Sequence, residues 1–266
     1  MPLDTRLLIP KRPSGVGLDV DAADYIRRVE DADKNYLEPI VRYAINNFVR
    51  GCKDDAIWSA LKASCLLMGA RTLSGALTPL VGSAPTNVGP FVAGDYTRGG
   101  TTPGLQGNGS TKAINTGRAG NADGQNDCHF AAWLTVAHTA AYLFTGGADS
   151  DNQVYEYPFA GRSAFFRLRT TAGGSAGSGN TFVTGFRGMS RASSANYTIR
   201  HQNATTTITE TSTTPSAENW RVFRSGTRTD STGDARICFY SIGSALTLTL
   251  LESRVSSLIN ALRDVA

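Results

Sequence analysis

The chain has 266 residues, of which 41% are hydrophobic and 18% charged, and its formal net charge is +4 at pH 7. A chain of this length buries enough surface to build a core without disulfides or metals. The small charge and the dispersed Lys and Arg residues argue against nucleic acid as a partner. No run approaches the ~20 apolar residues that cross a bilayer, so membrane insertion is also excluded.

Four cysteines stand apart in apolar runs and form no CxxC pair: Cys52, Cys65, Cys128 and Cys238. We therefore expect reduced thiols in the core. The first residues, MPLDTRLLIPKRPSG, hold an apolar patch that is too short for a signal-peptide core and is interrupted by proline. We expect a protein that is made in a cytoplasm and is not exported by a cleaved signal.

Helical periodicity dominates the first part of the chain. Residues 22–33 predict a short helix, and a longer one follows between Pro39, which suits a first turn, and Gly51, which suits a stop. The spacing of three and four predicts its buried face: Leu37, Ile40, Val41, Ala44, Ile45 and Phe48.

A third helix is expected directly afterwards, capped by Asp54 or Asp55 and ending before Gly69. Its predicted inward stripe is Ile57, Ala60, Leu61, Ser64, Cys65 and Met68. Residues 1–85 are accordingly predicted to form an N-terminal helical docking segment. A cap over one edge of a sheet is the alternative.

After residue 85 the composition turns to Gly, Ser, Thr and Asn, and apolar residues come in short runs between turn signals. This pattern predicts a β-sandwich or jelly roll over residues 86–245, because two stacked sheets bury alternate residues. The predicted strands are 110–116, 129–137, 140–146, 163–171, 181–188, 195–202, 205–213, 219–226 and 235–243.

Residues 246–266 predict a C-terminal amphipathic helix. Its apolar residues step by four, three, four and three, the spacing of a coiled-coil seam, but for only about two heptads. The helix either lies on its own domain or joins identical helices in a homo-oligomer. The candidate seam residues are Leu251, Val255, Leu258, Leu262 and Val265.

Two apparent catalytic motifs fail in context. Residues 104–117, GLQGNGSTKAINTG, resemble a phosphate loop, but Lys112 is three residues past Gly109 and a strand follows where the motif needs a helix. Residues 173–177, GGSAG, match a nucleophile elbow, but another strand follows and no acid lies between Ser175 and the last histidine, His201. We interpret both stretches as turns.

Metal ligands and catalytic carboxylates are also weakly represented. The three histidines lack zinc spacing. Calcium would find oxygen donors on two turn-forming segments, whose carboxylates are Asp123, Asp127, Asp149 and Asp151, although solvated turns explain them as well. No predicted strand carries two carboxylates four residues apart, as a glycosidase on a sandwich could use. We therefore expect no enzyme activity, no resident cofactor and at most a weak calcium site.

Several stretches taken together resemble the concanavalin-like jelly roll of the laminin G and lectin type. They are GLQGNGSTKAINTG, CHFAAWLTVA, YLFTGG, NWRVFRSG and the final ICFYSIGSALTLTLLESRVSSLI, and their order is that of the family. The resemblance implies a mainly β fold with helical flanks.

The lead from Asp24 to Asn87, the word GDYTR and the ending FYSIGSALTLTLLESRVSSLINAL resemble structural proteins of tailed bacteriophages that carry this jelly roll. That resemblance implies a virion component, displayed as a tail-fibre, baseplate or head-decoration subunit. Its partners would be other virion proteins, copies of itself and a host-surface polysaccharide. Two alternatives stay open: a carbohydrate-active depolymerase on the sandwich, and an intracellular lectin-like binding module.

Overall fold

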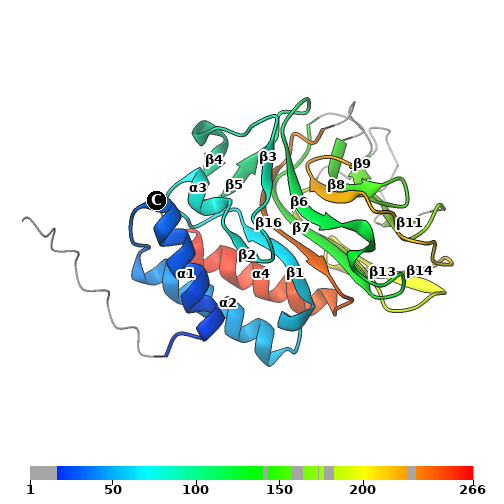
Figure 1. Ribbon diagram of the computed structural model, residues 1–266, viewed down its shortest axis with the longest axis horizontal. Coiled ribbons are helices and arrows are strands. Elements are labelled where there is room, and N and C mark those ends of the chain that lie inside the picture. Colours follow the sequence, from blue (N-terminus) through cyan, green and yellow to red (C-terminus); the bar gives the residue numbers. More distant parts are fainter. Residues whose placement is uncertain are drawn as a thin grey trace, which may run out of the picture.

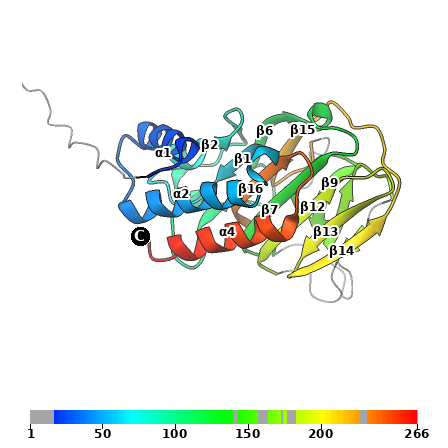
Figure 2. The ribbon, with the colours of Figure 1, turned by 90° about the horizontal axis from the view of Figure 1, so that it is seen from below.

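Two antiparallel sheets pack face to face, and a layer of helices covers the outer face of one of them (Figures 1 and 2). The computed structural model describes residues 17–139, 143–156, 164–172, 174–176, 183–226 and 232–265. The mainly β fold with helical flanks, a β-sandwich, is confirmed.

The first sheet, sheet A, has the strand order β14-β13-β12-β7-β16-β1-β2, and β5 extends it by pairing with β16 and β4. Its strands are β1 (Leu61–Leu66), β2 (Pro79–Val81), β4 (Tyr96–Thr97), β5 (Gly104–Gln106), β7 (Cys128–Val136), β12 (Gly185–Arg191), β13 (Asn196–His201), β14 (Ala204–Thr209) and β16 (Arg236–Gly243). The central pair β7 and β16 comes from segments 100 or more residues apart along the chain.

The second sheet, sheet B, has the order β11-β10-β9-β8-β15-β6-β3. Its strands are β3 (Thr86–Val88), β6 (Ala113–Ala119), β8 (Leu143–Asp149), β9 (Asn152–Glu156), β10 (Ala164–Leu168), β11 (Gly174–Ala176) and β15 (Asn219–Val222). Residues 104–117 form β5, a turn and most of β6, so the interpretation as a turn leading into a strand is confirmed.

Two apolar cores hold the three layers together. Between the sheets, Phe130 of β7 stacks on Trp220 of β15 with ring centroids 5.1 Å apart. Between the helices and sheet A, Phe48 meets Phe239 of β16 edge-on at 6.0 Å. Where the helical layer covers sheet A, the strands are therefore buried on both faces. Beyond the helices, they are buried only on the face that packs against sheet B.

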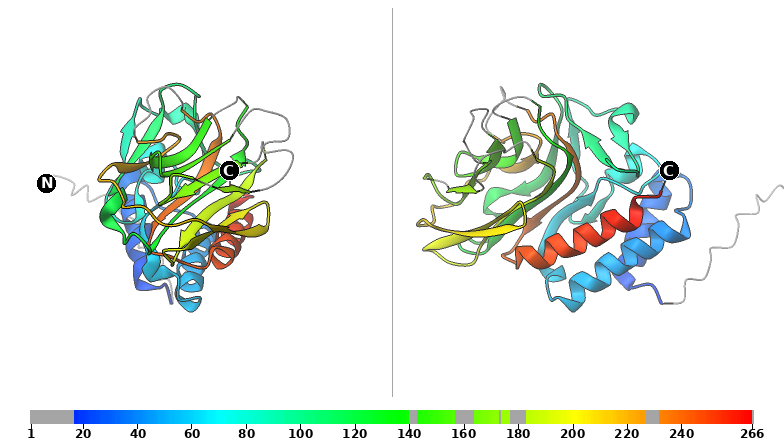
Figure 3. Two further views of the ribbon diagram at one scale, coloured as in Figure 1. Left: turned by 90° about the vertical axis from the view of Figure 1, so that its right-hand side faces the viewer. Right: turned by 180° about the vertical axis from the view of Figure 1, so that it is seen from behind.

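The helical layer consists of α1 (Val20–Asp33), α2 (Pro39–Asp54) and α4 (Leu248–Leu262), with short turns α3 (Leu73–Ala76), η1 (Trp58–Ala60), η2 (Ala93–Asp95) and η3 (Gly120–Ala122) elsewhere. Figure 3 shows α2 and α4 lying side by side on the sheet. None of the described helices is long and apolar enough to cross a membrane.

The helix predicted after Asp55 is wrong. Only η1 is helical there, and β1 follows and pairs with β16 and β2. Residues 63–68 are buried on both faces of the strand, and periodicity cannot distinguish such a continuous apolar run from a buried helix. Sheet A therefore includes strands from before residue 85, the boundary expected between the helices and the sandwich.

Of the two arrangements expected for the C-terminal helix, the structure shows the one in which the helix lies on its own domain. The candidate seam residues belong to the core between α4, α2 and the sheet, with exposed fractions between 0% and 7%. The seam residues Leu251, Val255, Leu258, Leu262 and Val265 are thus not available to identical helices, because their own chain covers them.

Candidate functional site

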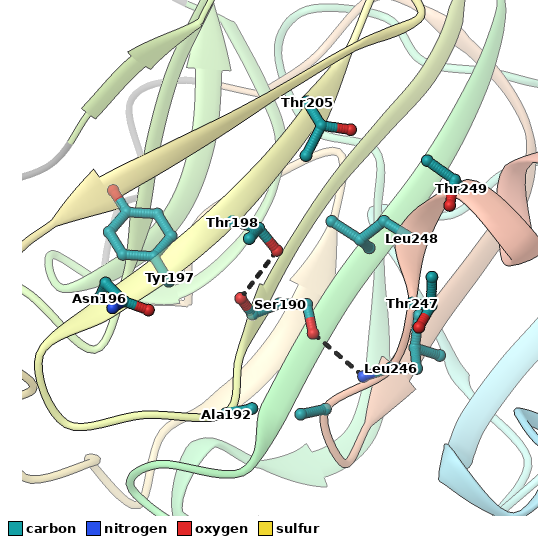
Figure 4. A pocket seen from close by; sticks show the side chains of 11 residues that line it. Ser190, Ala192, Asn196, Tyr197, Thr198, Thr205, Leu246, Thr247, Leu248 and Thr249 are labelled. Atoms are coloured by element: carbon teal, nitrogen blue, oxygen red, sulfur yellow. Dashed lines mark hydrogen bonds between the residues drawn. The ribbon is translucent and has the colours of Figure 1, made fainter.

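A groove of about 480 Å³ lies where the helical layer ends on sheet A. One wall is the outer face of β12, β13 and β14, and the other is the linker after β16 with the start of α4 (Figure 4). In Figure 2 the yellow hairpin β13–β14 extends beyond the helices. The groove is lined by Ser190, Ala192, Asn196, Tyr197, Thr198, Thr205, Ala245, Leu246, Thr247, Leu248 and Thr249.

Polar side chains on the strand wall stand in register. Ser190 of β12 pairs with Thr198 of β13, and Thr198 pairs with Thr207 of β14. The Thr198 hydroxyl donates to the Ser190 carbonyl oxygen over 3.3 Å (Figure 4). Because side chains alternate along a strand, every second residue of β13 and β14 faces the groove. The wall therefore carries hydroxyl and amide groups at a regular spacing.

A two-residue turn sets this register. Gln202 and Asn203 join β13 to β14 and have φ values of 51° and 60°. Positive φ at both positions is the conformation of a type I′ turn, whose twist matches that of the flanking strands. The turn thereby fixes the pairing in which Thr205 and Thr207 of β14 lie beside Arg200 and Thr198 of β13.

Three hydrogen bonds hold the linker wall. The Ser244 carbonyl oxygen lies 2.6 Å from Nδ1 of His129. The Ala245 N–H donates to a carboxylate oxygen of Asp127 over 2.7 Å. The Leu246 N–H donates to the Ser190 hydroxyl over 3.0 Å (Figure 4). The last bond joins the two walls directly. The linker is therefore positioned by β7, by the loop before it and by β12.

His129 is a neutral structural residue. It is fully buried, and its Nε2 lies 2.8 Å from the Ser241 hydroxyl. Because Nδ1 faces a carbonyl oxygen, which can only accept, Nδ1 carries the hydrogen and Nε2 accepts from Ser241. Burial lowers the pKa of His129 to about 4. The linker is thus anchored by an uncharged imidazole at neutral pH.

Arg191 supports the loop at the other end of the strand wall. Its side chain is fully buried, and its guanidinium lies over the Tyr197 ring at 5.0 Å from the centroid. Burial lowers the pKa of this group. Its nitrogens donate to the carbonyl oxygens of Leu168 (2.9 Å), Ser193 (3.0 Å), Glu210 (3.1 Å) and Asn196 (3.2 Å). One side chain therefore holds β10, the β12–β13 loop and the end of β14 together.

An ion pair adjoins the groove on the α4 side. Nε of Arg200, on β13, lies 2.5 Å from a carboxylate oxygen of Glu252, one turn into α4. Arg200 also donates to the Asn203 carbonyl oxygen and, over 3.3 Å, to the Thr205 hydroxyl. Its charge is balanced inside the protein.

The side chains that line the groove can form hydrogen bonds and apolar contacts, but none of them is an Asp, Glu, His, Lys, Arg or Cys. Tyr197 is the one titratable residue among those that line the groove. Its hydroxyl donates to the Phe166 carbonyl oxygen over 2.8 Å, and burial raises its pKa to about 12. The leucines and alanines of the linker add apolar surface. Such a groove can bind an uncharged polar molecule.

The calcium candidates are engaged elsewhere. Asp123 is paired with Arg118 at 2.5 Å, and Asp127 holds the linker. Asp149 accepts from the N–H of Asp151 over 2.8 Å, and Asp151 accepts from the Thr213 hydroxyl over 3.1 Å. Within the described ranges, no group of three or more His, Cys, Asp or Glu side chains is placed to hold a metal.

A line of Asp, His and Thr side chains, not predicted from the sequence, lies near β8. Nδ1 of His138 is 3.1 Å from Asp234, and its Nε2 is 3.4 Å from the Thr145 hydroxyl. The order resembles a nucleophile triad, but Thr145 and His138 are 0% and 2% exposed. The Ala235 N–H also donates to Nδ1 over 3.2 Å. A substrate cannot reach this hydroxyl, so the group is structural.

A second groove, of about 330 Å³, runs between the outer sides of α2 and α4. Ile40 and Tyr43 line it and are 56% and 64% exposed. Ile40 was predicted to lie on the buried face of α2, which is wrong. The buried face of α2 consists mainly of Val41, Ala44, Ile45, Phe48 and Cys52, so Ile40 falls outside it.

No protein-family model matches the sequence, and no curated protein matches it. Among solved structures, domain 4 of a GH43 extracellular arabinanase from Geobacillus stearothermophilus, in complex with arabinotriose, is similar at 12% identity and a TM-score of 0.43. That match covers 73% of this chain and 97% of that one. A Trypanosoma rangeli sialidase matches at 9% identity and a TM-score of 0.47, covering 85% of this chain and 39% of the sialidase.

The receptor-binding domain of botulinum neurotoxin type G matches at 13% identity and a TM-score of 0.46, over 74% of this chain and 51% of that one. This chain thus spans about half or less of the sialidase and of the toxin domain. At these TM-scores the likenesses assign no ligand or reaction. The expectation that the chain is not an enzyme rested only on missing motifs and is not supported, and glycoside hydrolases stand among the similar structures.

Proposed function

We propose that this protein is a carbohydrate-binding β-sandwich that holds a glycan in the groove between the β12–β13–β14 face and the start of α4. The observation that supports this is the lining itself: the strand wall carries hydroxyl and amide groups, the other wall alternates leucine and alanine with Thr247 and Thr249, and none of the lining residues is charged. Sugars present hydroxyls beside apolar C–H faces. Sites of this kind bind by a few placed polar groups on an apolar background.

The groove is also braced before any ligand arrives. His129, Asp127 and Ser190 hold the linker, and Arg191 holds the loop opposite. A braced site loses less conformational entropy on binding than a loose one, which favours affinity for a weakly interacting ligand such as a sugar.

Titration calorimetry of the full chain against a panel of oligosaccharides tests this function. The variant Thr198→Val removes a lining hydroxyl and keeps the branched shape, and it should weaken binding about fivefold to tenfold. Thr206→Val is the matched control, because Thr206 is exposed on the opposite face of β14. Failure of every sugar to bind would refute the function. Release of reducing ends in the same mixtures would assign a carbohydrate-active enzyme instead.

We also propose, from the resemblance of both ends of the chain to phage structural proteins, that the protein is a virion subunit displayed on a particle surface. The α2–α4 groove supports this role, because exposed Ile40 and Tyr43 beside it form the kind of apolar surface that marks contacts between proteins. Mass spectrometry of purified particles should detect the chain. Its absence from intact particles would contradict the assignment.

A further inference from the structure

The hydroxyl surface of the groove continues onto the edge of sheet A. Thr207 pairs with Thr198 and Thr209 pairs with Asn196, so each extends a row that begins in the groove. Thr205 lines the groove, and alternation along β14 turns Thr207 and Thr209 to the same face. We call Thr205, Thr207 and Thr209 the threonine edge.

The opposite face of β14 points inward, which confirms this orientation. Ile208 packs against the core between the sheets, and a Cβ on Gly174 of sheet B would lie 2.5 Å from its side chain. Thr207 and Thr209 are exposed, and β14 is the last strand of its sheet in the described part of the chain. A ligand in the groove can therefore extend onto the exposed side chains of the threonine edge.

The dimensions exceed a single sugar ring. Neighbouring strands lie about 4.8 Å apart and alternate residues of a strand about 6.6 Å apart. The rows from β12 to β14 therefore span about 10 Å, and the threonine edge about 13 Å. Such a surface has room for consecutive rings of one chain, with hydroxyl donors and acceptors under each.

Charge narrows the class of ligand further. Arg200, which contacts Thr205, is neutralised by Glu252 at 2.5 Å, and Glu252 is only 8% exposed. An acidic sugar would meet an arginine whose charge is already balanced, beside a partly buried carboxylate that repels it. The ion pair thus disfavours uronic and other acidic sugars.

We propose that the groove and the threonine edge together bind an uncharged, linear polysaccharide chain along several consecutive rings, and that the Arg200–Glu252 pair excludes acidic chains. This inference rests on the proposed carbohydrate-binding function. It adds to that function that the ligand is several rings long and uncharged.

Calorimetry with linear gluco-, manno- and galacto-oligosaccharides, from mono- to hexasaccharide, tests the length. Affinity for the bound series should rise about tenfold or more with chain length. The double variant Thr207→Val/Thr209→Val should lose about tenfold for the longer chains and nothing for the shortest that binds, while Thr206→Val leaves both unchanged. Valine keeps the branched shape that β-strands favour.

The charge is tested with oligogalacturonides. The native chain should bind them more weakly than the uncharged series, and Glu252→Gln should improve their binding several-fold by freeing Arg200. Circular dichroism and thermal melting of each variant confirm that it is folded. If Glu252→Gln unfolds, the comparison of neutral and acidic chains on the native protein decides alone.

The outcomes separate the inference from the function. A monosaccharide that binds as tightly as its oligomers, or a double variant with native affinity, would overturn the extension over the edge and leave the groove intact. Oligogalacturonide binding at or above the neutral affinity would overturn the charge selection. Absence of binding to any sugar would overturn both the inference and the proposed function.

Discussion

Nδ1 of His129, in the centre of sheet A, lies 2.6 Å from the carbonyl oxygen of Ser244, the first residue of the linker that closes the groove. A fully buried side chain on one strand thereby positions the wall of a surface site. The stability of the fold and the shape of the groove depend on the same hydrogen bond.

Replacement His129→Ala should lower the free energy of unfolding by roughly 2–4 kcal/mol, because it leaves a cavity and removes the partners of Ser241 and Ser244. Urea denaturation followed by circular dichroism measures this. Sugar affinity should fall as well, since the linker loses its anchor. An unchanged denaturation midpoint would contradict the structural role.

Acid should destabilise the protein through its buried histidines. Burial lowers the pKa of His129 to about 4, and burial with the nearby Arg187 charge lowers that of His201 to about 4, from 6.5. Between pH 4 and pH 6.5 the unfolded chain therefore binds protons at these histidines that the folded chain does not bind. Stability is therefore lost as pH falls from 6.5 towards 4, by up to about 3 kcal/mol for each histidine. Denaturation at pH 7 and pH 5 tests this above the carboxylate range, and equal stability at both would refute it.

His201 should be replaceable by an apolar residue. It is 2% exposed, and the ring meets Phe166 edge-on at 5.7 Å. Among the residues that the structure describes, neither ring nitrogen has a hydrogen-bond partner. His201→Leu removes two unsatisfied polar atoms and should leave stability at pH 7 unchanged or raise it by about 1 kcal/mol. It should also flatten the loss of stability with acid. A loss of several kcal/mol at pH 7 would show that the imidazole has a partner.

A charge on the inner face of α4 should unfold the domain and not dissociate an oligomer. Leu251→Asp and Leu258→Asp each bury a carboxylate in the helix–sheet core and should cost several kcal/mol. Ser253→Asp, on the exposed side of α4, is the control. Light scattering and thermal melting distinguish the outcomes, and a smaller mass with unchanged stability would favour the intermolecular seam.

We expect Asp127 to hold the linker by its hydrogen bond and not to bind calcium. Asp127→Ala removes the acceptor of the Ala245 N–H and should weaken sugar binding several-fold with a small loss of stability, because Asp127 is exposed. Millimolar calcium should leave the melting temperature of the native chain unchanged. A rise in melting temperature that Asp127→Ala abolishes would assign a calcium site.

Local pattern was sufficient for much of the fold. The short run of residues 195–202 between turn signals indicated a strand, and the stepped apolar residues of the range 246–266 indicated an amphipathic helix, as found. The run from Ala63 to Met68 was misassigned, because a strand covered by a core on each side shows neither period clearly.

The sequence by itself determined most of the apolar face of α2 and of α4 and the positions of most strands, because the apolar residues repeat with the period of each element. Only the tertiary structure decided what those faces meet. The leucines of α4 meet the protein's own α2 and sheet, and Asp127 meets a linker more than 100 residues away. The groove exists because β12–β14 and the start of α4, distant along the chain, are brought together by long-range pairing, which no local pattern contains.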